Sequence, residues 1–94
     1  MALFMVQHWH EAATCPAGDP QRGGMLLQLL ASAPKAGITI RAEAVVNGAH
    51  ELNIIAEGVD AATVEKFMAP FGMMGSVTVR PASMCEQVVE RGRC

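Results

Sequence analysis

The chain has 94 residues, of which 51% are hydrophobic and 17% are charged. This length predicts a single domain, residues 1–94, with one small core. Seven basic and nine acidic side chains give a net charge of −2, and the basic residues form no cluster, which excludes a nucleic-acid partner. No apolar run reaches the roughly 18 residues of a membrane span, so no membrane partner is expected.

The cysteine count and the first residues indicate the compartment. Three cysteines are present, and an odd number fits a reducing compartment better than a secreted disulfide framework. The first residues lack a basic segment followed by an apolar one, so we expect no signal peptide and a cytoplasmic location. The high apolar fraction of so short a chain also favours a homodimer, which would cover additional apolar surface.

The first predicted strand spans residues 2–10, and both of its faces are mostly apolar. This pattern is typical of a central strand that is covered on two sides. After a turn-rich loop, Asp19 is the expected N-cap of a helix, with Pro20 at the first helical position. The helix is expected to end before Pro34 and Gly37. Its apolar stripe at helical spacing consists of Met25, Leu26, Leu29, Leu30 and Ala33.

Residues 38–46 alternate between apolar and polar side chains, and the following Asn47-Gly48 is typical of a hairpin turn. We expect a three-residue loop over residues 46–48, because that register places apolar residues together on the buried face. The pairs expected across the hairpin are Ala44 with His50, Ala42 with Leu52, Ile40 with Ile54, and Glu43 with Glu51.

A second helix is predicted to begin after Asp60, its expected N-cap. Its buried stripe at positions i, i+3, i+4 and i+7 is Val64, Phe67, Met68 and Phe71. A fourth strand is predicted over residues 76–80. Ser83 and Glu86 have the spacing of a capping box, which predicts a short C-terminal helix ending at Gly92.

The order strand, helix, strand, strand, helix, strand predicts an α+β fold of the ferredoxin-like βαββαβ type. In that fold an antiparallel sheet with strand order 4-1-3-2 carries both helices on one face; here a short C-terminal helix follows. The other sheet face is expected to carry Met5, Gln7, Trp9, Arg41, Glu43, Asn53, Thr78 and Arg80. Because this face mixes apolar and polar side chains, we expect a second sheet to pack on it in a dimeric α+β barrel.

The pattern His-x-His-x4-Cys carries the chemistry of the chain: His8, His10 and then Cys15. Side chains two apart on a strand share a face, so the two imidazoles project together. The predicted topology brings His50 to the same end of the sheet. Because imidazole and thiolate are preferred ligands of zinc and copper, we expect a copper or zinc site formed by these four residues.

Other interpretations of the same residues stay open. Met73-Met74 at the same end would favour copper(I), although methionines more often fill gaps in a core. Without a metal, the imidazoles would be buried and hydrogen-bonded, and Cys15 would be an ordinary loop residue. In an enzyme, His10 is the candidate general acid or base, because imidazole titrates near neutral pH, and Glu11 or Glu51 would orient it.

The βαββαβ order over nearly the whole chain resembles the dimeric α+β-barrel superfamily, which includes small cofactor-free monooxygenases, haem-degrading enzymes and muconolactone isomerase-like proteins. The string H-x-H-x4-C-P-A-G and the terminal S-x-C-E-x-V-V-x-R-G-x-C also look like small bacterial proteins of that class. The resemblance is one of topology, and no catalytic motif matches residue by residue. It implies a homodimer with a pocket near His8 and His10, between sheet and helices, for a small apolar organic molecule.

Overall fold

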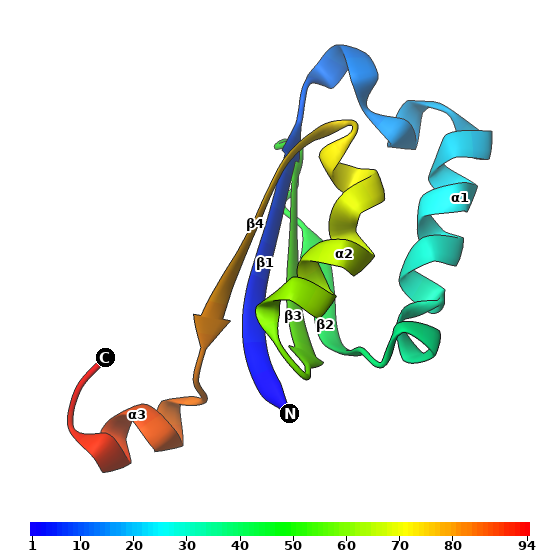
Figure 1. Ribbon diagram of the computed structural model, residues 1–94. Helices are drawn as coiled ribbons and strands as arrows, with labels where there is room; N and C mark the ends of the chain where they lie inside the picture. The colour runs from blue at the N-terminus through cyan, green and yellow to red at the C-terminus, as the bar shows by residue number, and fades with distance from the viewer.

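A computed structural model describes residues 1–94 and shows an α+β fold with one four-stranded antiparallel sheet. The strands are β1 (Ala2–His10), β2 (Thr39–Val45), β3 (Glu51–Gly58) and β4 (Gly75–Ala82). The α-helices are α1 (Pro20–Ala31), α2 (Ala61–Gly72) and α3 (Cys85–Arg91), and the 3-10 helices are η1 (Ala12–Thr14), η2 (Pro16–Gly18) and η3 (Ala33–Ala36). Figure 1 shows α1 and α2 on one side of the sheet and α3 apart from it, beyond the end of β4.

The strands lie in the order β2-β3-β1-β4, which is 4-1-3-2 when read from the β4 edge. Strand β1 is therefore central, as its two apolar faces predict. Trp9 pairs with Glu51, and His10 pairs with Gly75. The end of β1, the β2–β3 hairpin and the start of β4 consequently meet at one end of the sheet, and this end holds the predicted site.

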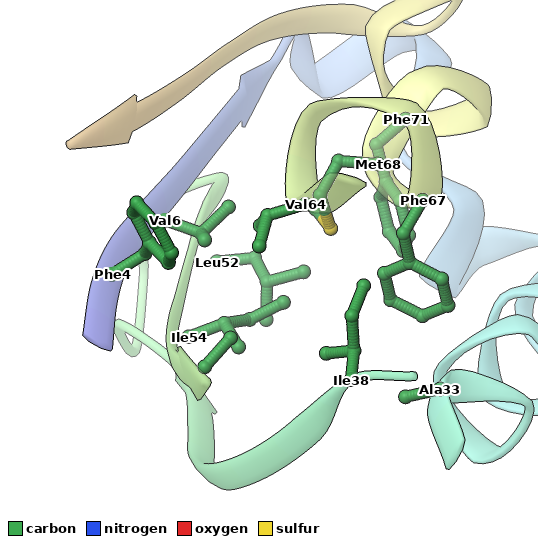
Figure 2. Packing of buried hydrophobic residues seen from close by; sticks show 11 residues of the cluster. Phe4, Val6, Ala33, Ile38, Leu52, Ile54, Val64, Phe67, Met68 and Phe71 are labelled. Atoms are coloured by element: carbon green, nitrogen blue, oxygen red, sulfur yellow. The ribbon is translucent and has the colours of Figure 1, made fainter. Parts of the chain in front are cut away.

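Helix α2 packs on the sheet through the stripe that its sequence predicts. Asp60 caps the helix, because its carboxylate accepts a hydrogen bond from the backbone N–H of Thr63 at 2.8 Å. All four stripe residues are buried: Val64, Phe67, Met68 and Phe71. They join the apolar side chains of the strands and of Ile38 in one core cluster (Figure 2). Burying each such side chain stabilises the fold by about 1.5–3 kcal/mol.

Helix α1 begins as predicted, since the carboxylate of Asp19 accepts hydrogen bonds from two backbone N–H groups of the first turn. The apolar stripe of this helix is only partly covered: no residue of α1 is fully buried, and Met25 is 62% exposed. Three leucines are only partly buried: Leu26, Leu29 and Leu30. Ala33 is buried but belongs to η3. The short segments before and after α1 thus connect it to the body, while its own face does not close on the sheet.

The predicted register of the hairpin is also wrong. Val45 pairs with Leu52, and Glu43 pairs with Ile54. The last hydrogen bond before the loop is donated by the backbone N–H of Val46 to the carbonyl of Glu51 at 3.0 Å. Four residues rather than three therefore form the loop.

The cause of the different register is a β-bulge between Ile40 and Ala42. A bulge inserts one residue into a strand, so the side chains beyond it change faces. Arg41, the inserted residue, forms an ion pair with Glu57 of β3 at 2.7 Å. Glu43 consequently lies on the helix-covered side of the sheet, not on the opposite face where the sequence placed it.

The helix-free face of the sheet carries a chain of hydrogen bonds between side chains. Arg80 donates to Gln7 at 3.2 Å, and Gln7 donates to Asn53 at 2.9 Å. Asn53 donates to Glu51 at 2.8 Å, and Glu51 also accepts from the indole of Trp9 at 2.9 Å. This face is thus mixed in character, as predicted, and its polar groups satisfy one another.

Helix α3 begins at Cys85, with Met84 rather than Ser83 as its N-cap. The side chain of Gln87 accepts a hydrogen bond from the backbone N–H of Met84 at 3.3 Å, so it takes the place that the predicted box gave to Glu86. The hydroxyl of Ser83 accepts instead from Arg91 at 3.1 Å. None of the helices combines the length and the apolar character that a membrane crossing needs.

Candidate functional site

A cavity of about 560 Å³ lies between α1 and the end of the sheet where β1 meets the β2–β3 hairpin. This volume falls within the about 300–1,000 Å³ of sites that bind small molecules. Much of the wall is apolar and comes from α1, α2 and the hairpin: Leu26, Leu27, Leu30, Val45, Leu52 and Phe71. The predicted site residues His8, His10, Cys15 and His50 all line the same cavity. The apolar face of α1, which packs on the core only through partly buried leucines, is therefore also one wall of the candidate site.

Three of the four predicted ligands converge in this cavity. His10, Cys15 and His50 each offer one ligand atom, and these atoms all lie within 4.8 Å of one another. The three residues come from different segments: the end of β1, the turn between η1 and η2, and the hairpin loop. The backbone N–H of His10 donates to the carbonyl of His50 at 3.2 Å, and the two ring centroids are 5.1 Å apart. The backbone pairing thus brings the two imidazoles close together.

The position of Cys15 depends on the two 3-10 turns around it. Its backbone N–H donates to the carbonyl of Ala12 at 3.3 Å, and its own carbonyl accepts from Gly18 at 3.2 Å. Pro16 next to it is buried. A Cβ at Gly23 would lie only 3.3 Å from the Pro16 carbonyl oxygen, so the glycine lets the first turn of α1 approach this loop closely. The thiol is consequently held at the cavity wall.

His8 lies outside the group of converging ligand atoms, although the sequence predicts it as a ligand. It is only 2% exposed, and both of its ring nitrogens have partners. Its Nδ1 is 3.1 Å from the carbonyl oxygen of Ser76, and its Nε2 is 3.2 Å from Nδ1 of His10. The ring also packs edge-on against Phe71 with 5.2 Å between centroids. His8 therefore contacts the site through His10.

His10 has one engaged nitrogen and one free nitrogen. Its Nδ1 contacts His8, whereas its Nε2 is buried and has no hydrogen-bond partner. Burial lowers the pKa of His10, and the nearby His50 lowers it further. Burial also lowers the pKa of His8, against the hydrogen bond to Ser76, which raises it. Both shifts favour the neutral ring, the form in which imidazole binds a metal or accepts a proton.

Glu51 and Glu11 do not orient His10, contrary to the expectation from the sequence. The carboxylate of Glu51 lies on the helix-free face, where hydrogen bonds from Asn53 and then Trp9 hold its pKa below the usual range. Glu11 is exposed and does not line the cavity. The imidazole that the sequence described as a ligand, His8, occupies the orienting position instead.

The methionines and the other two cysteines also lie elsewhere. Met73 is 89% exposed, and Met74 packs against the core, so neither lines the cavity. Cys85 and Cys94 are exposed free thiols outside the site. A charged residue of the cavity was missed from the sequence: Glu43 reaches the wall because the bulge reverses its face, and no local signal in the sequence marks that bulge.

No protein-family model matches the chain, and no curated protein matches it either. The chemistry of the site thus follows from its own residues. Two imidazoles and a cysteine side chain at one end of an apolar cavity have two uses: they can bind a metal ion of intermediate or soft character, or they can transfer protons to and from an apolar molecule.

Proposed function

We propose that this chain is a small metal-binding protein that holds a copper or zinc ion through His10, Cys15 and His50. One observation supports the proposal above the others: a ligand atom from each residue lies within 4.8 Å of the other two, and one of the imidazoles has a buried Nε2 without a partner. A buried polar atom that lacks a hydrogen bond is costly, by about 1–3 kcal/mol, so it points to a missing ligand.

The separation of the ligand atoms fits a metal after a small adjustment. Zinc bonds of about 2.0–2.1 Å to nitrogen and 2.3 Å to sulfur place tetrahedral ligand atoms about 3.3–3.6 Å apart. The observed limit of 4.8 Å therefore requires movements of about 1 Å. Cys15 and His50 lie outside the regular strands, in a turn and a hairpin loop, and their side chains have the freedom to make this adjustment.

The donor set decides which metals are candidates. Two imidazoles and a thiolate suit zinc and copper and disfavour magnesium and calcium, which prefer oxygen ligands. Three protein ligands leave at least one coordination position without a protein donor, as in zinc sites that also bind water or substrate. Here the three ligands line an apolar cavity, so an external ligand would reach the metal through that cavity.

The direct test is the metal content of protein purified without a histidine tag. We expect one copper or zinc ion per chain and loss of that ion in Cys15→Ser, because a neutral hydroxyl replaces the thiolate. The affinity should fall by more than the about 10–100-fold that the loss of an outer partner costs. Cys85→Ser is the matched control, since this exposed thiol lies outside the site. Metal-free wild-type protein that also fails to bind added zinc or copper(I) would refute the proposal.

A second candidate function is an enzyme that acts on a small apolar organic molecule, as isomerases and monooxygenases of the dimeric α+β barrels do. The apolar cavity of about 560 Å³, which His10 lines, and the Nε2 of His10 that lacks a hydrogen-bond partner favour this function. His10 would accept a proton in its neutral form. Binding of apolar probe molecules by protein that holds no metal, abolished in His10→Phe, would favour the enzyme over the metal-binding protein.

We further propose that the fold is ferredoxin-like and that two copies pair through their helix-free sheet faces to form a barrel. The strand order and the shared side of α1 and α2 support the first part. Partly buried Met5 and Ile55 among polar groups, next to Trp9 at 38% exposure, support the second. Light scattering should give twice the chain mass of 10.0 kDa, and Trp9→Glu should give the monomer. A monomeric wild-type protein at high concentration would exclude this pairing.

A further inference from the structure

A row of hydrogen bonds leads from the backbone of β4 through His8 to Nδ1 of His10. The carbonyl of Ser76 is the first member, and it can only accept. Nδ1 of His8 lies 3.1 Å from it, so that nitrogen carries the hydrogen and donates. The bond anchors the His8 ring to a regular strand, because Ser76 pairs with Trp9 within the sheet.

The second member of the row is Nε2 of His8. The ring is 2% exposed and packs on Phe71, in surroundings that disfavour a charged imidazole. A neutral ring with its hydrogen on Nδ1 has a lone pair on Nε2. Nδ1 of His10 lies 3.2 Å from that lone pair, so it must carry a hydrogen to make the bond. The hydrogen of neutral His10 is thereby assigned to Nδ1.

From this row we infer that His8 is a positioning residue, which fixes the ring and the tautomer of His10 so that the lone pair lies on Nε2, the buried nitrogen without a partner. The inference rests on the proposed function in one respect: it takes Nε2 of His10 as the atom that meets the ligand. Histidines that bind metals commonly donate their other N–H to a fixed acceptor, and the loss of that acceptor weakens binding. Here the acceptor is a second imidazole, itself oriented by the backbone.

The same geometry explains why His8 differs from the three converging residues. A ring whose two nitrogens are both engaged has no lone pair left for a metal. Were His8 instead a ligand through Nε2, its bond to His10 would have to break. His10 would then lose the only partner of its Nδ1, and neither nitrogen of that ring would have a hydrogen bond.

The tautomers can be measured directly in metal-free protein by long-range ¹⁵N–¹H correlation spectra of the histidine rings at pH 7.5. We expect His8 and His10 both to carry hydrogen on Nδ1, which is the minor tautomer of a solvated histidine. A hydrogen on Nε2 of His10 would overturn the inference. This measurement needs no metal, so it decides the role of His8 even if the chain binds neither copper nor zinc.

Two variants separate positioning from packing. His8→Phe keeps a ring of similar size but removes both nitrogens, whereas His8→Gln keeps an acceptor near the position of Nε2. If His8 positions His10, His8→Phe weakens zinc binding by about 10–100-fold and His8→Gln restores part of it. If His8 only fills space, the order is reversed, because phenylalanine is the better filler. Zinc affinity equal to wild type in His8→Phe, with the fold intact by circular dichroism, would also overturn the inference.

Discussion

The two helices that lie on the same side of the sheet behave differently. Helix α2 buries Val64, Phe67, Met68 and Phe71, whereas α1, also of 12 residues, buries none. Both helices carry an apolar stripe and an aspartate N-cap, so neither hydrophobicity nor capping accounts for the contrast. The difference lies in what each helix faces: α2 packs on core strands, and α1 faces the cavity and its imidazoles.

The contrast shows how so short a chain combines a stable core with a binding site. The part of the molecule around α2, here called the α2 half, supplies the buried apolar area. The part around α1, the α1 half, leaves a cavity of about 560 Å³ at the end of the sheet. The carboxylate of Glu43, placed on the covered side by the bulge, would be costly under a docked helix but is tolerated beside a cavity. We expect ligand binding to order the α1 half and to change the α2 half little.

The contrast is tested most strongly by the same substitution in both helices. Met68→Ala should lower the free energy of unfolding by about 2–5 kcal/mol, because Met68 is 1% exposed and its removal leaves a cavity. Met25→Ala on α1 should change it by less than about 0.5 kcal/mol, since Met25 is 62% exposed. Urea unfolding of both variants measures the difference. Similar losses in the two variants would mean that α1 packs as tightly as α2 in solution.

The next largest effect is expected from the metal. Zinc at a free concentration 100 times its dissociation constant should stabilise the protein by about 2.7 kcal/mol, because it binds the folded chain. A chelator should reverse this gain, and Cys15→Ser should abolish it. Hydrogen exchange should then slow mainly in α1 and in the loop around Cys15. Equal slowing in α2 would contradict the division of the molecule into a rigid half and a half that the ligand orders.

The difference between the halves also separates what the sequence predicts from what it does not. Asp19, Asp60 and the stripe of α2 follow from residues within one or two helical turns, and the structure confirms them. The His-x-His spacing correctly placed His8 and His10 on one face for the same reason, since strand periodicity is local. Signals of this kind do not depend on distant parts of the chain.

The features that were missed depend on distant parts. At the bulge Arg41 forms an ion pair with Glu57 on the neighbouring strand, and the bulge reverses the face of Glu43. The role of His8 depends on a carbonyl 68 positions away in the chain, that of Ser76. The cavity beside α1 depends on how the neighbouring 3-10 turns position the helix. In each case, sequence periodicity identifies the residues but not their long-range partners.

A smaller effect is expected at the two glycines in the first turns of α1. Gly24→Ala should stabilise the protein by up to about 1 kcal/mol, because alanine favours a helix and a Cβ at this site meets no atom within 4 Å. Gly23→Ala should gain less, because its Cβ would lie 3.3 Å from the Pro16 carbonyl oxygen. Thermal unfolding compares the two. If the melting temperature rises equally in both variants, α1 is free to move away from the loop that holds Cys15.

The smallest expected effect concerns the cap of α2 in acid. Hydrogen bonds from the side chain and backbone of Thr63 lower the pKa of Asp60. The unfolded chain therefore takes up a proton at a higher pH than the folded one, so this contribution to stability is complete above the ordinary aspartate pKa of about 3.9 and is lost as the pH falls through the lowered value. Asp60→Asn keeps an acceptor for Thr63 but does not titrate. Between pH 6 and pH 3 the melting temperature of wild type should fall more than that of Asp60→Asn. If the melting temperatures of both proteins fall in parallel, other groups cause the acid sensitivity, and the titration of Asp60 does not contribute to it.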